Sequence, residues 1–215
     1  MKPVIITAAN NNGNTKRFID TFNKHVNNAE LKVLSFNPEI KGAFKHYDKG
    51  YPGHIKKYEY LREHIENDRW YIYLDMFDVI FQKDIPDLDK FKTDILVSSE
   101  RHLWRQSDFY KRQIENDDDL YIILDSPVYC SGTFAMKGNL LVDLINFYGN
   151  VKGVLNQPYF NLWLHDKNHA NCDELFCTLH KGIDNGYVKK QDNLFINDGK
   201  VSSIVHGNGS YDKYL

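Results

Sequence analysis

The chain has 215 residues, of which 42% are hydrophobic and 14% aromatic, and this is enough to bury a sizeable core in a single domain over residues 1–215. A formal net charge of −2 argues against a broadly basic nucleic-acid-binding surface. Three cysteines make no disulfide framework, and neither a secretion signal nor a spanning apolar stretch is found, so we expect a cytoplasmic protein with no membrane segment.

The first part of the chain alternates apolar runs with helical patterns. Residues 3–9 are expected to form a strand, and Phe18, Ile19 and Phe22 then follow with helical spacing. The next expected elements are a strand over 31–36, a polar loop over 41–52, a helix over 55–65 and a strand that ends at Asp75. This alternation predicts βαβ units.

The second part of the chain continues the mixture of strands and helices. The expected elements are strands over 94–99, 133–136, 194–196 and 203–205, helices over 109–115, 140–148 and 173–179, and an acidic turn over 117–119. No repeat or linker divides the chain. We therefore predict an α/β fold whose mostly parallel central sheet is flanked by helices.

The most informative segment is WYIYLDMFDVIF at residues 70–81. Its apolar and aromatic residues predict a buried strand, and Asp75 and Asp78 follow at the carboxyl end, the edge where open α/β sheets bind ligands. Two carboxylates suit Mg²⁺ or Mn²⁺, and such an ion can bind a diphosphate. The same acids are also typical of a helix cap or a turn.

A second candidate ligand lies near the carboxyl end, where an apolar run reaches His206 and then Gly207 and Gly209. Glycines there would let backbone amides approach phosphate oxygens. A lone histidine is more often a structural residue than a ligand, so the value of His206 depends on its meeting Asp75 and Asp78 in space.

Five short segments in this order resemble the glycosyltransferase domain of the procollagen lysyl hydroxylases and the related collagen galactosyltransferases. They are DMFD at 75–78, SSERHLW at 98–104, CSGTF at 130–134, DELF at 173–176 and HGNG at 206–209. The resemblance covers nearly the whole chain. It implies the GT-A fold, a Rossmann-like fold that binds nucleotide sugars.

The resemblance implies that Asp75, Asp78 and His206 hold Mn²⁺, with Mg²⁺ as the alternative, on the diphosphate of UDP-glucose or UDP-galactose. It also implies a set of residues beside the donor, which could otherwise be ordinary surface or capping residues. These are Thr7, Lys57, Phe77, Asn208, Gly209 and Lys213.

By the same resemblance, Trp104 lies near the donor sugar, and Asp173 and Glu174 belong to an acidic cluster beside it. One such carboxylate would take a proton from the acceptor hydroxyl or stabilise an oxocarbenium-like state. The alternatives are that Trp104 packs against the edge of the sheet and that Asp173 caps a helix N-terminus.

The chain departs from the family at four positions. The family usually has Asn where this chain has Cys130, Gly where it has Thr133, and a longer acidic run where it has Asn171 and Cys172. The resemblance implies that these positions touch the sugar or the acceptor. The choice between glucose and galactose therefore stays open, as does the acceptor, which could be a hydroxylated protein side chain, a glycan or a hydroxymethylated nucleobase.

The sequence thus predicts a metal-dependent glycosyltransferase that moves a hexose from a UDP-sugar to a hydroxyl acceptor. One alternative is a catalytically silent UDP-sugar or carbohydrate-binding module, which the altered CSGTF and NCDELF segments favour. Another is a two-aspartate phosphohydrolase. In that class the second acid follows two positions after the nucleophile, whereas Asp75 and Asp78 are three positions apart.

Overall fold

The computed structural model describes residues 1–9, 15–35, 57–108, 111, 114, 117–151, 156–179, 187–207 and 215. The helices are α1 (Thr15–His25), α4 (Gly138–Asn150) and α5 (Asn156–Leu164), with short 3₁₀ turns at Arg62–His64, Leu88–Lys90, Trp104–Gln106 and Asp118–Ile123. The expected loop over 41–52 and most of the expected helix over 109–115 lie outside these residues.

The central sheet has the strand order β2-β1-β3-β6-β5-β7. Its members are β1 (Val4–Ala9), β2 (Glu30–Ser35), β3 (Trp70–Leu74), β5 (Ile95–Leu103), β6 (Pro127–Lys137) and β7 (Ala170–Asn171). The pairings of β1 with β2 and β3, and of β5 with β7, are parallel, whereas β6 runs antiparallel to both β3 and β5. The fold is therefore mixed α/β, and the sheet is mixed.

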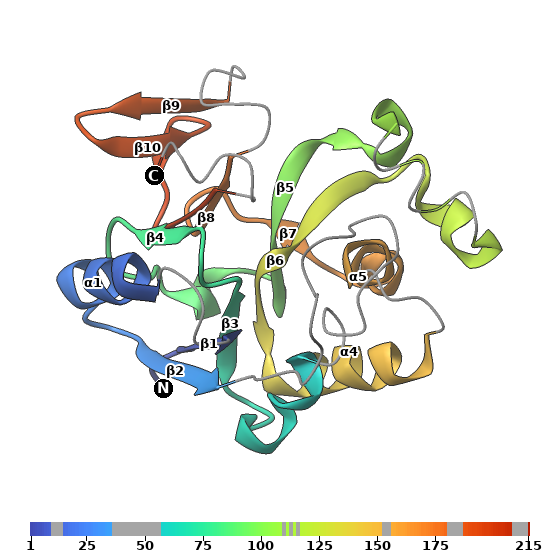
Figure 1. Ribbon diagram of the computed structural model, residues 1–215, viewed down its shortest axis with the longest axis horizontal. Coiled ribbons are helices and arrows are strands. Elements are labelled where there is room, and N and C mark those ends of the chain that lie inside the picture. Colours follow the sequence, from blue (N-terminus) through green and yellow to red (C-terminus); the bar gives the residue numbers. More distant parts are fainter. Residues whose placement is uncertain are drawn as a thin grey trace.

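Helices cover both faces of this sheet, with α1 on one side and α4 and α5 on the other (Figure 1). Strand β3 is buried at every residue, which explains its unbroken apolar and aromatic sequence. Alternate residues of β3 belong to the two main core clusters, with Tyr71 and Tyr73 facing α4 and α5, and Ile72 and Leu74 facing α1. The acids that follow β3 are thus held by a rigid central strand.

The helices dock through apolar stripes of helical period. In α1, Phe18 and Phe22 are buried one turn apart, and Lys24 and His25 lie in the last turn, where positive charge complements the helix dipole. The longer α4 buries a fuller stripe of the same period, made of Leu141, Leu144, Ile145 and Tyr148.

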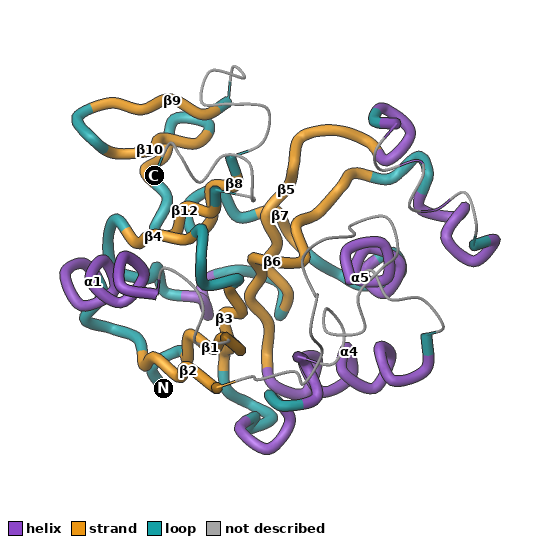
Figure 2. Tube along the Cα trace, viewed as in Figure 1, coloured by secondary structure: helices purple, strands orange, loops and turns teal. Residues whose placement is uncertain are grey.

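Two smaller sheets complete the fold (Figure 2). One joins β4 (Val79–Phe81), β12 (Ile204–His206) and β8 (Phe176–Thr178), and the other joins β9 (Val188–Gln191), β10 (Leu194–Asn197) and β11 (Lys200–Val201). The turns of the second sheet hold Asp192-Asn193 and Asp198-Gly199, all with positive φ, as two-residue type I′ hairpins require.

Three sequence expectations differ from the structure. The helix expected over 173–179 is wrong, because a turn at residues 173–175 leads directly into β8. The strand expected over 133–136 is the end of the much longer β6. Helix α5 was not expected, because buried residues surround it on nearly all sides and leave no amphipathic period.

Candidate functional site

The four residues Asp75 to Asp78 form the turn between β3 and β4. The Asp75 amide donates a hydrogen bond of 2.8 Å to the carbonyl of Gly132 in β6, and the Gly207 amide donates one of 2.6 Å to the Asp78 carbonyl. Backbone contacts with two distant segments therefore fix both ends of this turn at the carboxyl end of the central strand.

His206 reaches this turn because β12 pairs antiparallel with β4, in a register that places His206 opposite Val79. The imidazole is buried, and its Nε2 lies 3.1 Å from Asp78 Oδ1. Burial alone would lower the pKa of His206, but Asp78, with a contribution from Cys130, raises it well above its ordinary value. The position between Nε2 and the Asp78 carboxylate therefore favours a positive charge, either a proton or a metal ion.

Gly132 lies where Asp75 and His206 converge. A Cβ atom placed on this glycine would lie 2.7 Å from Asp75 Oδ2 and 3.1 Å from His206 Cε1. The carboxylate and the imidazole therefore approach one point from two different segments. Both occupy space that a side chain at position 132 would fill.

Two donors hold the other oxygen of Asp75. Lys57 Nζ donates a hydrogen bond of 2.7 Å to Asp75 Oδ1, and the hydroxyl of Tyr73 donates one of 3.0 Å to the same atom. Burial, together with the charge of Asp75, raises the pKa of Tyr73 well above its usual range, so the phenol stays protonated and remains a donor. Since both donors contact Oδ1, Oδ2 is the oxygen directed toward Gly132.

The carboxylate oxygens of Asp75 and Asp78 and the imidazole nitrogen of His206 suit a hard divalent cation that also accepts a nitrogen ligand, such as Mn²⁺. Within the described part of the chain, no group of three or more His, Cys, Asp or Glu side chains is already arranged as a metal centre. The carboxylates of Asp75 and Asp78 instead contact Lys57 and His206. The residues present fit the ion chemically, and its binding would exchange the contact between His206 and Asp78 for metal bonds.

Two of the residues expected beside the donor lie close to the same end of the sheet. Thr7 in β1 is completely buried, and its Oγ1 has no hydrogen-bond partner within the described residues. Such a buried hydroxyl could be satisfied by a polar atom of a ligand. Phe77 lies in the turn itself and packs against the core cluster on the α1 side, while its carbonyl accepts a hydrogen bond of 3.1 Å from Arg17. Besides Lys57, described above, the other residues expected beside the nucleotide sugar are Asn208, Gly209 and Lys213, and these lie outside the described residues.

Trp104 is completely buried in the core cluster that packs under α4 and α5. This location matches the alternative that the indole packs against the sheet. The aromatic side chain therefore supports the segment that follows β5 rather than presenting a surface to solvent.

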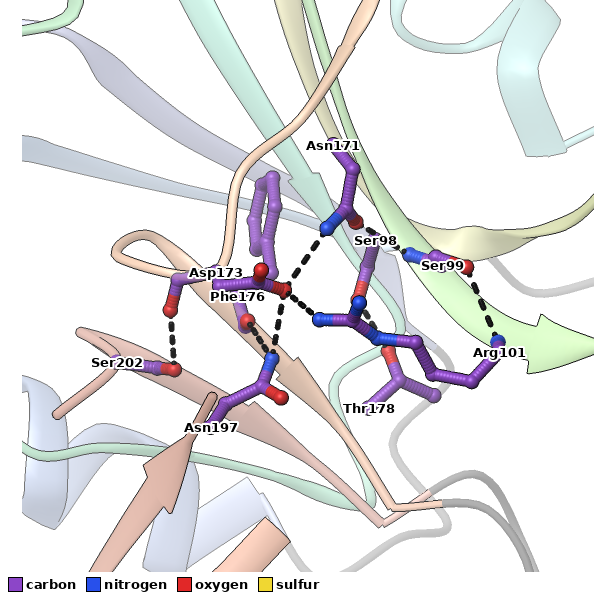
Figure 3. Close-up of polar contacts among 9 residues, drawn as sticks. All are labelled: Ser98, Ser99, Arg101, Asn171, Asp173, Phe176, Thr178, Asn197 and Ser202. Atoms are coloured by element: carbon purple, nitrogen blue, oxygen red, sulfur yellow. Dashed lines mark hydrogen bonds and ion pairs between the residues drawn. The ribbon is translucent and has the colours of Figure 1, made fainter. Parts of the chain in front are cut away.

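Asp173 is the centre of a polar network (Figure 3). Its Oδ1 accepts hydrogen bonds from Arg101 Nη2 at 2.5 Å, Asn171 Nδ2 at 2.8 Å and Asn197 Nδ2 at 2.9 Å. Its backbone carbonyl accepts a further one from Ser202 Oγ at 2.6 Å. These contacts tie together β5, β7, β10 and the segment before β12, which favours a structural role for this carboxylate.

Arg101 holds a backbone conformation that its residue type rarely adopts, with a φ of +61°. It lies where β5 and β6 shift register, between the pairs that involve Ser99 and Leu103. Its amide donates a hydrogen bond of 3.0 Å to Ser99 Oγ. The irregular backbone thus directs the guanidinium toward Asp173, as bulges often re-aim a side chain.

Glu174 does not join this network. Its carboxylate forms an ion pair with Lys90, with Nζ to oxygen distances of 2.9 and 2.8 Å. Asp89, the residue before Lys90, accepts a hydrogen bond from Trp70, which is the first residue of β3. Asp75 instead follows the last residue of that strand. These contacts indicate that Glu174 lies toward the end of β3 opposite Asp75.

Sequence reasoning missed the roles of three residues that shape the site. Tyr73 was read only as a buried strand residue, although a tyrosine two positions before a strand-end aspartate can reach its carboxylate along the same face. Gly132 was noted only as part of the CSGTF segment, and the convergence of Asp75 and His206 on it depends on tertiary contacts. The third, Cys130, was noted only as a departure from the family.

No protein-family model matches this chain, and a search of curated proteins gives no significant match. Among the described residues, no helix combines the length and the apolar character needed to cross a membrane.

Proposed function

We propose that this protein is a metal-dependent glycosyltransferase of the GT-A type, which transfers glucose or galactose from a UDP-sugar to a hydroxyl acceptor. The observation that carries the proposal lies at the carboxyl end of the central strand, where Asp75 and His206 both approach Gly132 and Asp78 lies 3.1 Å from Nε2 of His206. This is the edge at which open α/β sheets bind nucleotides.

Each side chain has a distinct task in this proposal. Asp75, Asp78 and His206 would hold Mn²⁺, which supplies a Lewis acid that neutralises the charge developing on the departing UDP. Lys57 and Tyr73 would fix Asp75 through Oδ1, so that Oδ2 faces the ion. The buried hydroxyl of Thr7 supports a polar contact with the nucleotide at the neighbouring strand.

A second candidate is a UDP-sugar-binding module without catalytic activity. It is favoured by the contacts of the two expected acids, because Asp173 accepts three hydrogen bonds on one oxygen and Glu174 is paired with Lys90. It is also favoured by the complete burial of Trp104. Both candidates require the same donor site, which is the site at Asp75, Asp78 and His206 that would bind the metal ion and the UDP-sugar. They differ only in turnover.

Calorimetric titration of the full chain with UDP, with and without Mn²⁺, tests the donor site. We expect UDP binding that requires Mn²⁺ and that disappears when the metal is chelated. An assay of UDP release from UDP-glucose and UDP-galactose then separates the two candidates, since metal-dependent release indicates a transferase and binding without release indicates a module. Metal-independent binding, or no binding, would contradict the donor site, and phosphate release from phosphomonoesters would favour the phosphohydrolase.

A Gly132→Ala substitution is expected to weaken Mn²⁺ binding by roughly 10-fold and to leave the fold intact, since displaced supporting groups typically cost 10–100-fold in metal affinity. The new Cβ would lie 2.7 Å from Asp75 Oδ2, so the carboxylate has to move away. This movement costs little stability because Oδ2 is the end of a flexible side chain that is 40% exposed. The affinity is measured by titration with Mn²⁺, and the stability by thermal melting.

Gly149→Ala is the matched control for this variant, because a Cβ there meets no atom within 4 Å. Gly149 lies in α4, where alanine is expected to stabilise the protein by about 0.5–1 kcal/mol. Its Mn²⁺ affinity should equal that of the wild type. Equal affinity in Gly132→Ala as well would show that no ion binds beside Gly132.

A further inference from the structure

Cys130 lies in β6, two residues before Gly132, and its side chain is buried. Its Sγ atom is 3.3 Å from Nδ1 of His206. The family that the sequence resembles usually has asparagine, not cysteine, at this position. The contact is therefore a property of this chain.

Three residues surround the imidazole of His206 on three sides. Cys130 and Gly132 lie two positions apart and so face the same side of β6. Cys130 contacts Nδ1, the position of a Cβ on Gly132 lies 3.1 Å from Cε1, and Asp78 contacts Nε2. The ring is thereby held with Nε2 toward Asp78 and Nδ1 toward the thiol.

The two ring nitrogens need different protonation states when Nε2 binds a metal ion. Nε2 must then supply a lone pair, so the remaining proton of the neutral ring is carried by Nδ1. A sulfur atom is a weak acceptor for that N–H. A partner on the second nitrogen commonly sets both the tautomer and the orientation of a metal-binding histidine.

We propose that Cys130 is a positioning residue that accepts a hydrogen bond from Nδ1 of His206 and so presents Nε2 to a divalent cation beside Asp75 and Asp78. This inference rests on the proposed donor site and adds to it the residue that orients its histidine. In this role the Cys130 thiol contacts the ring on the side away from the ion, and it is not itself a ligand.

Cys177 provides a matched control, because it is a second buried cysteine and lies next to β12, the strand that carries His206. It lies in β8, where it pairs with Val205, the residue before His206. Its side chain belongs to an apolar cluster with Leu179, Val188 and Phe195, and burial raises the pKa of its thiol to about 12. Its replacement perturbs the packing near His206 but removes no contact from the imidazole.

The experiment measures Mn²⁺ affinity from the electron paramagnetic resonance signal of the free ion, in the full chain without nucleotide. Cys130→Ala and Cys130→Val both remove the acceptor, and valine also fills the space of the thiol. We expect both to weaken Mn²⁺ binding by about 10–100-fold. Cys130→Ser restores an acceptor, and we expect its affinity to return to within about threefold of the wild type. Cys177→Ala should bind Mn²⁺ as the wild type does.

The possible outcomes separate this inference from the donor site on which it rests. If the wild type binds Mn²⁺ and Cys130→Val binds it equally well, Cys130 does not position His206, although the donor site stands. An affinity of Cys130→Ser as low as that of Cys130→Val would also overturn the inference. If the wild type does not bind Mn²⁺, the donor site itself is wrong, and the positioning role is overturned with it.

Discussion

An Asp78→Asn variant is expected to lose Mn²⁺ affinity by on the order of 100-fold or more, because removal of a ligand exceeds the roughly 10–100-fold cost of losing a supporting contact. The amide keeps the shape of the side chain but removes the negative charge. The hydrogen bond from the Gly207 amide is made to the Asp78 carbonyl, so it does not depend on this side chain. Titration with Mn²⁺ and then with UDP measures the loss, and thermal melting shows whether the fold is retained.

Asp89→Asn is the control for the charge change. Asp89 forms an ion pair with Lys137 and accepts a hydrogen bond from Trp70, at the opposite end of β3 from Asp75. The hydrogen bond from Lys137 lowers the pKa of Asp89, so the carboxylate is ionised and its replacement also removes one negative charge. Its Mn²⁺ affinity should stay within about twofold of the wild type, since distant exposed charges are largely screened by salt. Unchanged affinity in Asp78→Asn would remove Asp78 from the site.

The position of Asp75 and Asp78 could be predicted from sequence because it depends on local pattern. A fully apolar strand followed by two acids allows few arrangements, and the structure has β3 ending at Leu74. The sequence also named His206 as a candidate, from its place between an apolar run and two glycines and from the family resemblance, but it could not show that this histidine meets Asp78. Its approach to Asp78 depends on the pairing of β12 with β4, a strand of three residues that is too short to give a periodic signal.

The roles of Trp104 and Asp173 were harder to predict, because tertiary contacts decide them. Trp104 stands among polar residues in the sequence, yet it is completely buried. Asp173 follows a polar segment that resembles a helix start, but its carboxylate accepts hydrogen bonds from residues of three other segments. A local pattern cannot show which donors the folded chain will bring to one oxygen.

The hairpin turns illustrate the opposite case, in which a local signal was present and was not used. Asp198-Gly199 is one of the sequences that type I′ turns prefer, and both residues have positive φ in the structure. The residues on either side pair as β10 and β11. The sequence therefore held enough information to predict this hairpin, which supplies Asn197 to the network around Asp173.

An Asp173→Asn variant is expected to destabilise the fold by about 2–3 kcal/mol and to leave Mn²⁺-dependent UDP binding unchanged. Removing one partner of a fully buried ion pair typically costs about 3–5 kcal/mol, and the lower value allows for side chains of Asp173 and Arg101 that are 17% and 25% exposed. The substitution leaves the guanidinium of Arg101 without its counter-charge. It also replaces the carboxylate oxygen that accepts three hydrogen bonds by an uncharged amide group. For a chain of this size, the melting temperature should fall by roughly 5–10 °C.

Glu174→Gln is the matched control, because it removes the neighbouring negative charge from an ion pair that is more exposed. The hydrogen bond from Lys90 lowers the pKa of Glu174, so this pair contributes above the unfolded-state pKa near 4.5, and its contribution is lost as the pH falls through the lower folded-state value. With side chains 43% and 32% exposed, the pair should contribute at most about 1 kcal/mol at neutral pH. A melting temperature of Asp173→Asn equal to that of the wild type, combined with the loss of sugar transfer, would instead assign Asp173 to the chemistry of the sugar.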